Sequence, residues 1–89
     1  MGKISIRKMT TEEAENAGIT SWPIWTKEIS RFDWTYRGDE ECYIIEGDFF
    51  VESAEGTVHI KPGDFVSFQD GLKCTWDIRI PVKKYYSFP

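Results

Sequence analysis

The sequence predicts a small all-β barrel that carries one short helix near its N-terminus. Strand-like segments alternate with Gly- and Pro-containing turns about every 8–12 residues, which is typical of sandwiches and barrels. Within these segments apolar and polar residues alternate with a period of two, as expected of strands with one buried face. The chain has 89 residues, so we expect residues 1–89 to form a single domain.

The N-terminal part is expected to hold a short strand or an extended arm over 3–9, followed by the helix. Thr10 and Glu13 match a capping box, in which each side chain accepts a hydrogen bond from the other residue's backbone. Gly18 is the residue type that often ends a helix, so this helix is short and depends on docking for its stability. The next segment, Trp22-Pro23-Ile24-Trp25, is rigid and aromatic. We expect it to cover one open end of the core, with a ligand platform as the alternative.

From residue 32 onward the pattern is that of strands. The clearest alternation lies in 72–79, where the apolar residues share one side. Segment 41–46 is apolar at most positions, which predicts a strand covered on both faces. Gly47-Asp48 is expected to reverse the chain, and Pro81 to precede a separate last strand. The expected strands are 32–37, 41–46, 49–53, 57–60, 65–68, 72–79 and 82–88.

The composition argues against several classes of protein. The net charge of −4 disfavours a nucleic-acid partner, because phosphates need a basic surface. No apolar run approaches the ~20 residues of a membrane span, and the N-terminus lacks the apolar core of a signal peptide. We therefore expect a cytoplasmic protein without a membrane partner. Cys42 and Cys74 are expected to be buried free thiols.

The spacing of one glutamate and one glycine resembles the first motif of the cupin family. Trp34-x-Tyr36-x-x-x-Glu40, followed after six residues by Gly47, keeps that spacing. The likeness is to small single-domain cupins (RmlC-like jelly rolls) of the ureidoglycine aminohydrolase and ethanolamine-utilisation type. It covers about residues 22–89 and implies a cupin-type β-barrel, or double-stranded β-helix, in that part of the chain.

The resemblance also bears on metal binding, because typical cupins hold a metal with the histidines and the glutamate of their motifs. Here Trp34 and Tyr36 stand at the two histidine positions of the first motif, and Cys74 stands at that of the second. An indole cannot ligate a metal, since its N–H only donates. Glu40 and Cys74 alone fall short of the three protein ligands of a catalytic zinc site. No cofactor is therefore predicted, with a divalent metal at Glu40 and Cys74 as the alternative.

The same residues predict a pocket inside the barrel. Strand parity places Trp34, Tyr36, Cys74 and Trp76 on inward faces. We expect Glu40 to share their cavity, with a position at its wet rim as the alternative. A buried carboxylate needs hydrogen-bond donors, which the Tyr36 hydroxyl and the indole N–H groups would supply. Because an aromatic cage beside a carboxylate suits a cation, we expect a small polar or cationic ligand, recognised in part by Glu40.

Two other functions stay open. In one, the barrel is a small enzyme that depends on a metal or uses Glu40 in isomerase, lyase or aminohydrolase-like chemistry. In the other, it is an interaction module with a vestigial pocket. Arg79, Lys83 and Lys84 are expected to form a solvated basic edge, and His59 to point outward. The family resemblance favours a homodimer.

Overall fold

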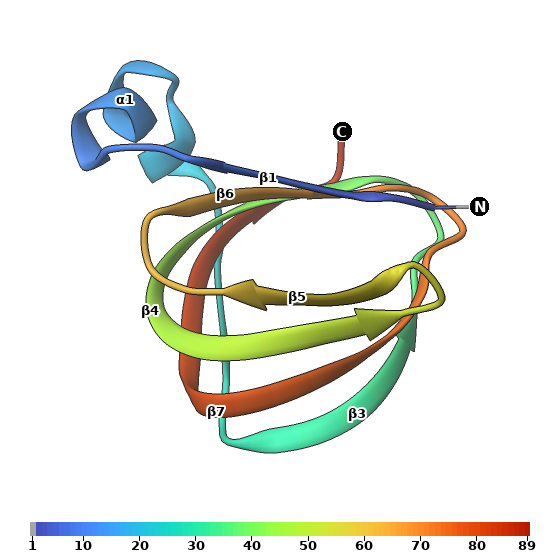
Figure 1. The fold of residues 1–89 in the computed structure, drawn as a ribbon. Coiled ribbons are helices and arrows are strands. Elements are labelled where there is room, and N and C mark those ends of the chain that lie inside the picture. Colours follow the sequence, from blue (N-terminus) through green and yellow to red (C-terminus); the bar gives the residue numbers. More distant parts are fainter. Residues whose placement is uncertain (1) are drawn as a thin grey trace.

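The computed structural model describes residues 2–89 and contains seven strands, all paired antiparallel (Figure 1). The helix α1 spans Thr11–Asn16 and is followed by a 3₁₀ turn, η1 (Ile19–Ser21). The predicted all-β fold with one short N-terminal helix is confirmed. The strands are β1 (Ile4–Lys8), β2 (Ile24–Lys27), β3 (Ser30–Thr35), β4 (Glu40–Ser53), β5 (Gly56–Ile60), β6 (Asp64–Phe68) and β7 (Lys73–Ser87).

Two long strands, β4 and β7, form the centre of the sheet and pair with each other over most of their length. The first part of β4 also pairs with β6, and its second part pairs with β5. Strand β7 pairs first with β3 and then, after its bend, with β2, while β1 extends the sheet beyond β6. Because both long strands pass through both layers, one sheet folds over on itself into a small barrel (Figure 1).

The bend in the two long strands corrects two predictions. Gly47-Asp48 does not reverse the chain, and Pro81 does not separate two strands, because β4 and β7 run continuously through these positions. Gly47 has a φ of 119°, and a Cβ on it would lie 2.9 Å from both the Pro81 carbonyl oxygen and the Val82 Cα. The pairing register shifts at the same place, as in a β-bulge. The glycine therefore lets both strands bend together where their backbones come close.

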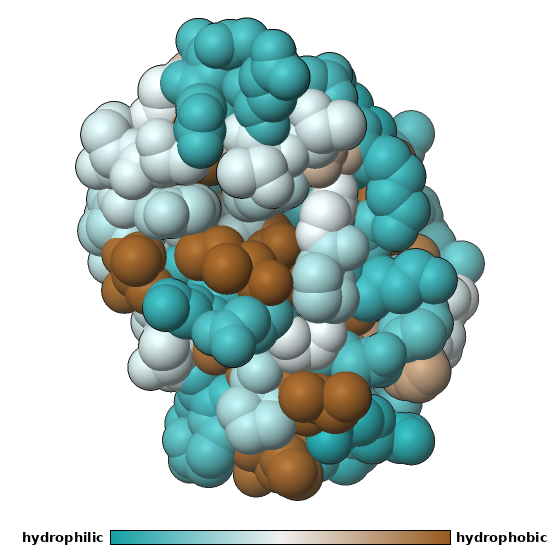
Figure 2. All heavy atoms as spheres, turned by 90° about the vertical axis from the view of Figure 1, so that its left-hand side faces the viewer, coloured by the Kyte–Doolittle hydropathy of each residue, from teal (hydrophilic) through white to brown (hydrophobic). Residues whose placement is uncertain are grey.

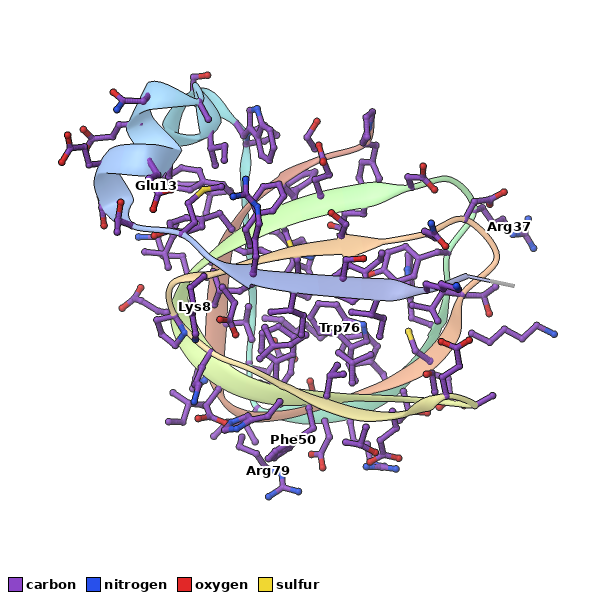
Figure 3. All side chains as sticks on the ribbon, turned by 45° about the horizontal axis from the view of Figure 1, so that its top comes forward. Lys8, Glu13, Arg37, Phe50, Trp76 and Arg79 are labelled. Atoms are coloured by element: carbon purple, nitrogen blue, oxygen red, sulfur yellow. The ribbon has the colours of Figure 1, made fainter. Side chains whose placement is uncertain are left out.

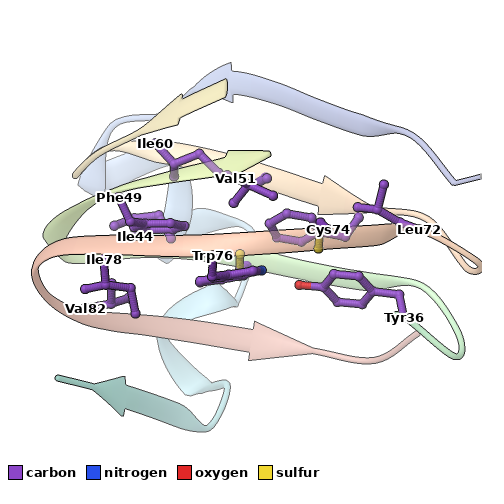
Figure 4. Close-up of a cluster of buried hydrophobic side chains, with 13 residues drawn as sticks. Tyr36, Ile44, Phe49, Val51, Ile60, Leu72, Cys74, Trp76, Ile78 and Val82 are labelled. Carbon is purple, nitrogen blue, oxygen red and sulfur yellow. The ribbon is translucent and has the colours of Figure 1, made fainter. Parts of the chain in front are cut away.

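The interior of the barrel is one apolar cluster (Figure 4). Trp76 lies at its centre, stacked on Phe49 with ring centroids 4.6 Å apart. The prediction that 41–46 is covered on both faces is confirmed for Cys42 and Ile44, which are buried in the barrel, and for Tyr43, which is buried beneath the helix. The buried members of the cluster are Tyr36, Cys42, Ile44, Phe49, Val51, Ile60, Val66, Phe68, Leu72, Cys74, Trp76, Ile78 and Val82.

The helix covers part of the outer face of the sheet, over Tyr43, Phe65 and Tyr85. Its capping box is formed as predicted, with Thr10 and Glu13 exchanging side-chain-to-backbone hydrogen bonds of 3.0 and 3.1 Å. Trp22 packs in the same outer cluster, with its ring centroid 6.5 Å from that of Phe65, so it covers an outer face of the sheet and not the predicted open end of the core. On this side of the molecule, hydrophobic atoms form separate patches below a hydrophilic top (Figure 2). Within residues 2–89, no helix has the length and apolar character needed to cross a membrane.

Candidate functional site

A cavity of about 510 Å³ opens into the barrel between its two layers. Four of the five predicted pocket residues line it, namely Trp34, Tyr36, Glu40 and Trp76, whereas Cys74 lines a neighbouring hollow. The wall is largely aromatic and carries charged groups of both signs. Its full lining is Trp25, Lys27, Phe32, Asp33, Trp34, Tyr36, Glu40, Trp76, Lys84, Tyr86 and Phe88.

Glu40 lies at the inner end of the cavity with both carboxylate oxygens engaged. Its Oε1 accepts a hydrogen bond of 2.8 Å from the Tyr36 hydroxyl, as the sequence predicts for a buried carboxylate. Its Oε2 accepts a hydrogen bond of 2.8 Å from the Lys84 ammonium, and both charged side chains are only 5% exposed. Burial and the nearby Glu40 charge raise the pKa of Tyr36, which therefore stays a neutral donor.

The prediction of a solvated basic edge is wrong for Lys84, which is buried. Its ammonium lies inside the barrel, 4.8 Å from the ring centroid of Trp25 and 4.8 Å from that of Trp76. Arg79, by contrast, is exposed and pairs with Asp77, as expected for a solvated residue. Figure 3 shows Trp76 inside the barrel and Arg79 on its outer surface. The aromatic cage beside Glu40 thus already holds a cation, and the chain itself supplies it.

The two aromatic residues at the cupin histidine positions differ in their exposure. Tyr36 is buried, and its hydroxyl points along the interior toward Trp76 (Figure 4). Trp34 is 50% exposed and lies at the rim, with its ring edge-on to that of Tyr36 at 6.3 Å. Trp34 is therefore placed to contact a molecule that enters the cavity, while Tyr36 orients the carboxylate.

The prediction that an indole N–H donates to Glu40 is wrong for Trp76, whose N–H has no hydrogen-bond acceptor among residues 2–89 although the residue is only 2% exposed. Burial raises the pKa of the neighbouring Cys74 thiol. An unsatisfied buried donor costs on the order of 1–3 kcal/mol. The interior beside the cavity therefore contains one donor that the described residues leave without an acceptor.

The residues at the cupin metal positions do not fit a metal. Glu40 is neutralised by Lys84, and the Cys74 thiol donates to the Trp34 carbonyl oxygen over 3.6 Å. Within residues 2–89, no three His, Cys, Asp or Glu side chains come close enough together to hold an ion. His59 points outward, as predicted, and its Nε2 lies 2.7 Å from an Asp48 carboxylate oxygen.

Both cysteines are free thiols and both are buried, which confirms the expectation. Cys42 is packed inside the barrel, where burial raises the pKa of its thiol to about 12. At neutral pH both thiols are therefore protonated and poorly nucleophilic.

Sequence reasoning missed several residues of the cavity wall, above all Lys84. Val82 is buried, and residues two apart on a strand share a face, so Lys84 and Tyr86 follow it inward. That alternation was readable in the sequence, but adjacent Lys83 and Lys84 instead indicated a charged edge. Trp25 also lines the cavity, and the alternative that its segment is a ligand platform stays a prediction for this tryptophan.

Comparison with known proteins identifies the fold and a matching family. The model of the EutQ-like cupin domain matches residues 14–86. A DUF861 family protein from Thermotoga maritima, known from a crystal structure, is 41% identical to this chain. It has a TM-score of 0.91 over 98% of this chain and 100% of its own. No curated protein matches the chain.

Two further solved structures share the fold at lower identity. A putative ethanolamine utilization protein Q from Salmonella typhimurium LT2 is 19% identical, with a TM-score of 0.64 over 93% of this chain and 66% of its own. The EutQ protein of Clostridium difficile is 20% identical, with a TM-score of 0.65 over 97% of this chain and 68% of its own. At such identities the likeness concerns the fold alone.

Proposed function

This chain belongs to the family of EutQ-like cupin domains, and we propose that it binds a small polar molecule in its barrel cavity without a metal. The observation that carries the proposal is the hydrogen-bonded cluster of Tyr36, Glu40 and Lys84 at the inner end of an aromatic cavity. A volume of about 510 Å³ falls within the range of small-molecule sites. Apolar walls with a few fixed polar groups are the usual composition of such sites.

The geometry narrows the expected ligand. A cationic molecule would meet the Lys84 ammonium, which already occupies the cage formed by Trp25 and Trp76. Glu40 already pairs with that ammonium and with the Tyr36 hydroxyl, so no free carboxylate is left to bind a cationic ligand. We therefore propose that the ligand is polar and no longer expect it to be a cation.

The two alternatives receive less support. As a general base, Glu40 would have to act from a side chain that is only 5% exposed, with each carboxylate oxygen already accepting a hydrogen bond from Tyr36 or Lys84. An interaction module with a vestigial pocket would be favoured by a filled interior, whereas the barrel contains an open cavity. Neither alternative accounts for a buried ion pair at the end of an accessible space.

The test is a screen of small amines, ureides, sugars and carboxylic acids against the purified chain, followed by amide chemical shifts. We expect hits to shift the resonances of cavity residues. Trp34→Ala should weaken binding by roughly three- to tenfold, the equivalent of one aromatic contact. Ile80→Ala is the matched control, because Ile80 is 55% exposed and outside the cavity lining while Trp34 is 50% exposed. Hits that bind both variants equally, or shift only residues elsewhere, would contradict the proposal.

A further inference from the structure

We propose that the cavity takes a small molecule with one negative charge, such as a monocarboxylate, and that Lys27 binds that charge. This inference rests on the proposed function, since it names the class of ligand for the same cavity. Its basis is the distribution of charge along the wall. Two lysines border the cavity, and only one of them is neutralised by a carboxylate at hydrogen-bond distance.

The inner charges cancel each other. Lys84 and Glu40 form a pair at 2.8 Å, and the second Glu40 oxygen is bound by the Tyr36 hydroxyl. This end of the cavity therefore presents no uncompensated charge to a ligand. A polar group that reaches it meets donors rather than a free carboxylate, because Tyr36 and Lys84 occupy both carboxylate oxygens.

Lys27 supplies a charge that is compensated only by a longer, exposed ion pair with Glu28. It lies two residues from Trp25 on β2, so both side chains face the cavity. Its ammonium lies 5.4 Å from the ring centroid of Phe32, another cavity residue. Among residues 2–89, the nearest carboxylate is that of Glu28, at 3.7 Å, which exceeds hydrogen-bond distance. Glu28 is also 77% exposed, so water screens this contact.

Asp33 is the other acidic residue of the lining, and it does not neutralise Lys27. It pairs with Thr75 across β3 and β7, and its Oδ1 accepts a hydrogen bond of 2.8 Å from the Thr75 hydroxyl. On β3 it alternates with Phe32 and Trp34, so its side chain is directed toward the opposite face of the strand. The charge that a ligand meets beside Phe32 is therefore that of Lys27.

The aromatic rings between Lys27 and Lys84 indicate the shape and polarity of the uncharged part of the ligand. Phe32 and Trp76 stack with centroids 6.0 Å apart and planes inclined by 20°. Lys27 lies over the first ring and Lys84 over the second. A flat or apolar body would lie along these rings while its carboxylate reaches Lys27. The wall thus matches a small amphipathic monoanion better than a sugar or an amine.

The experiment compares three probes of the same shape on the full chain: phenylacetate, its neutral amide phenylacetamide, and benzylamine. We expect phenylacetate to bind about three- to tenfold more tightly than the amide, as for one partly screened charge-assisted contact. Benzylamine should bind most weakly. The preference for the acid should disappear in Lys27→Met and persist in Lys27→Arg. It should also persist in the control Lys83→Met, since Lys83 is outside the lining.

A salt titration gives a second readout on the unmodified chain. The acid–amide preference should shrink as the salt concentration rises from 0.05 to about 0.5 M, because screening weakens an exposed ion contact. Equal binding of acid and amide, or a preference that survives in Lys27→Met, would overturn the anion inference while the proposed function stands. If none of the three probes shifts the cavity resonances, the proposed function fails as well.

Discussion

The Glu40 carboxylate and the Lys84 ammonium face each other inside an apolar barrel, where either charge alone would be costly. Tyr36 adds a hydrogen bond to the carboxylate, and two indole rings contact the ammonium. Together these contacts leave neither charge unpaired. The cluster therefore positions the polar groups of the cavity, and it depends on both charged partners being present.

We expect that removal of one charge destabilises the fold and that removal of both is much less harmful. Lys84→Met should lower the free energy of unfolding by about 3–5 kcal/mol, because it leaves the Glu40 carboxylate buried without its counter-charge. In the double variant Glu40→Met and Lys84→Met, no charge stays buried, so most of that loss should be recovered. Urea unfolding of the two single variants and the double variant gives the coupling free energy. Additive losses would show that the two groups do not interact.

The individual residues show how far sequence reasoning reaches. The inward faces of Tyr36 and Trp76 and the outward face of His59 follow from strand parity, which is a local property. The position of Lys84 follows from the same rule. A charged side chain, however, is expected inside the barrel only if a residue of opposite charge is buried beside it. That partner, Glu40, lies on another strand, and the sequence does not state which strands pair.

At the scale of single elements, the bend of β4 against β7 is the feature that creates the two layers. Gly47→Ala should be strongly destabilising, because the added Cβ meets the Pro81 carbonyl and the Val82 backbone at 2.9 Å. Gly56→Ala is the matched control, since its φ of 126° is similar while no atom lies within 4 Å of its added Cβ. Both variants carry the cost of a strained φ, on the order of 1–3 kcal/mol.

The difference between the two glycine variants isolates the close approach of the strands. We expect Gly47→Ala to lose at least about 1–3 kcal/mol more than Gly56→Ala, as is usual for overpacked sites. Thermal and urea unfolding of both variants measure this difference. Equal losses would mean that backbone conformation alone requires a glycine at the bend.

The element that depends on local signals could be predicted from the sequence, whereas the elements that depend on contacts between distant residues could not. The helix was predictable because its capping residues, Thr10 and Glu13, lie three positions apart and act on each other. The continuous paths of β4 and β7 were not, because Gly47 and Pro81 carry the usual signals of a turn. At these positions β4 and β7 bend together because they pair with each other, and that pairing cannot be read from either segment alone.

At the scale of the whole molecule, the spacing of Glu40 and Gly47 predicted the family, whereas the chemistry of the inward side chains predicted the site. The predicted resemblance to small cupins is confirmed by the match to the EutQ-like cupin domain. Glu40 begins β4 and Gly47 lies at its bend, so the spacing between them corresponds to a strand start and a bend of the fold. In this chain the barrel forms with Trp34, Tyr36 and Cys74 at the histidine positions. The homodimer stays a prediction, which light scattering on the purified chain would check.

The alkaline limit of the folded molecule should be set in part by its buried neutral groups. Burial raises the pKa of Cys42 from 9.0 to about 12, and it also raises the pKa of Tyr36 above its ordinary value. Between pH 9 and 12 the unfolded chain releases the Cys42 proton while the folded chain keeps it. Unfolding is then coupled to proton release, so stability is full below pH 9 and falls as the pH rises.

Cys42→Ala tests this linkage. Each such group contributes a slope of up to about 1.4 kcal/mol per pH unit to the free energy of unfolding. The variant loses some stability at every pH, because it removes a buried sulfur, but its decline above pH 9 should be shallower than that of the unmodified chain. Urea unfolding at intervals from pH 7 to about 10.5 gives both slopes. Parallel declines would show that Cys42 ionises as readily in the folded barrel as in the unfolded chain, contrary to its complete burial.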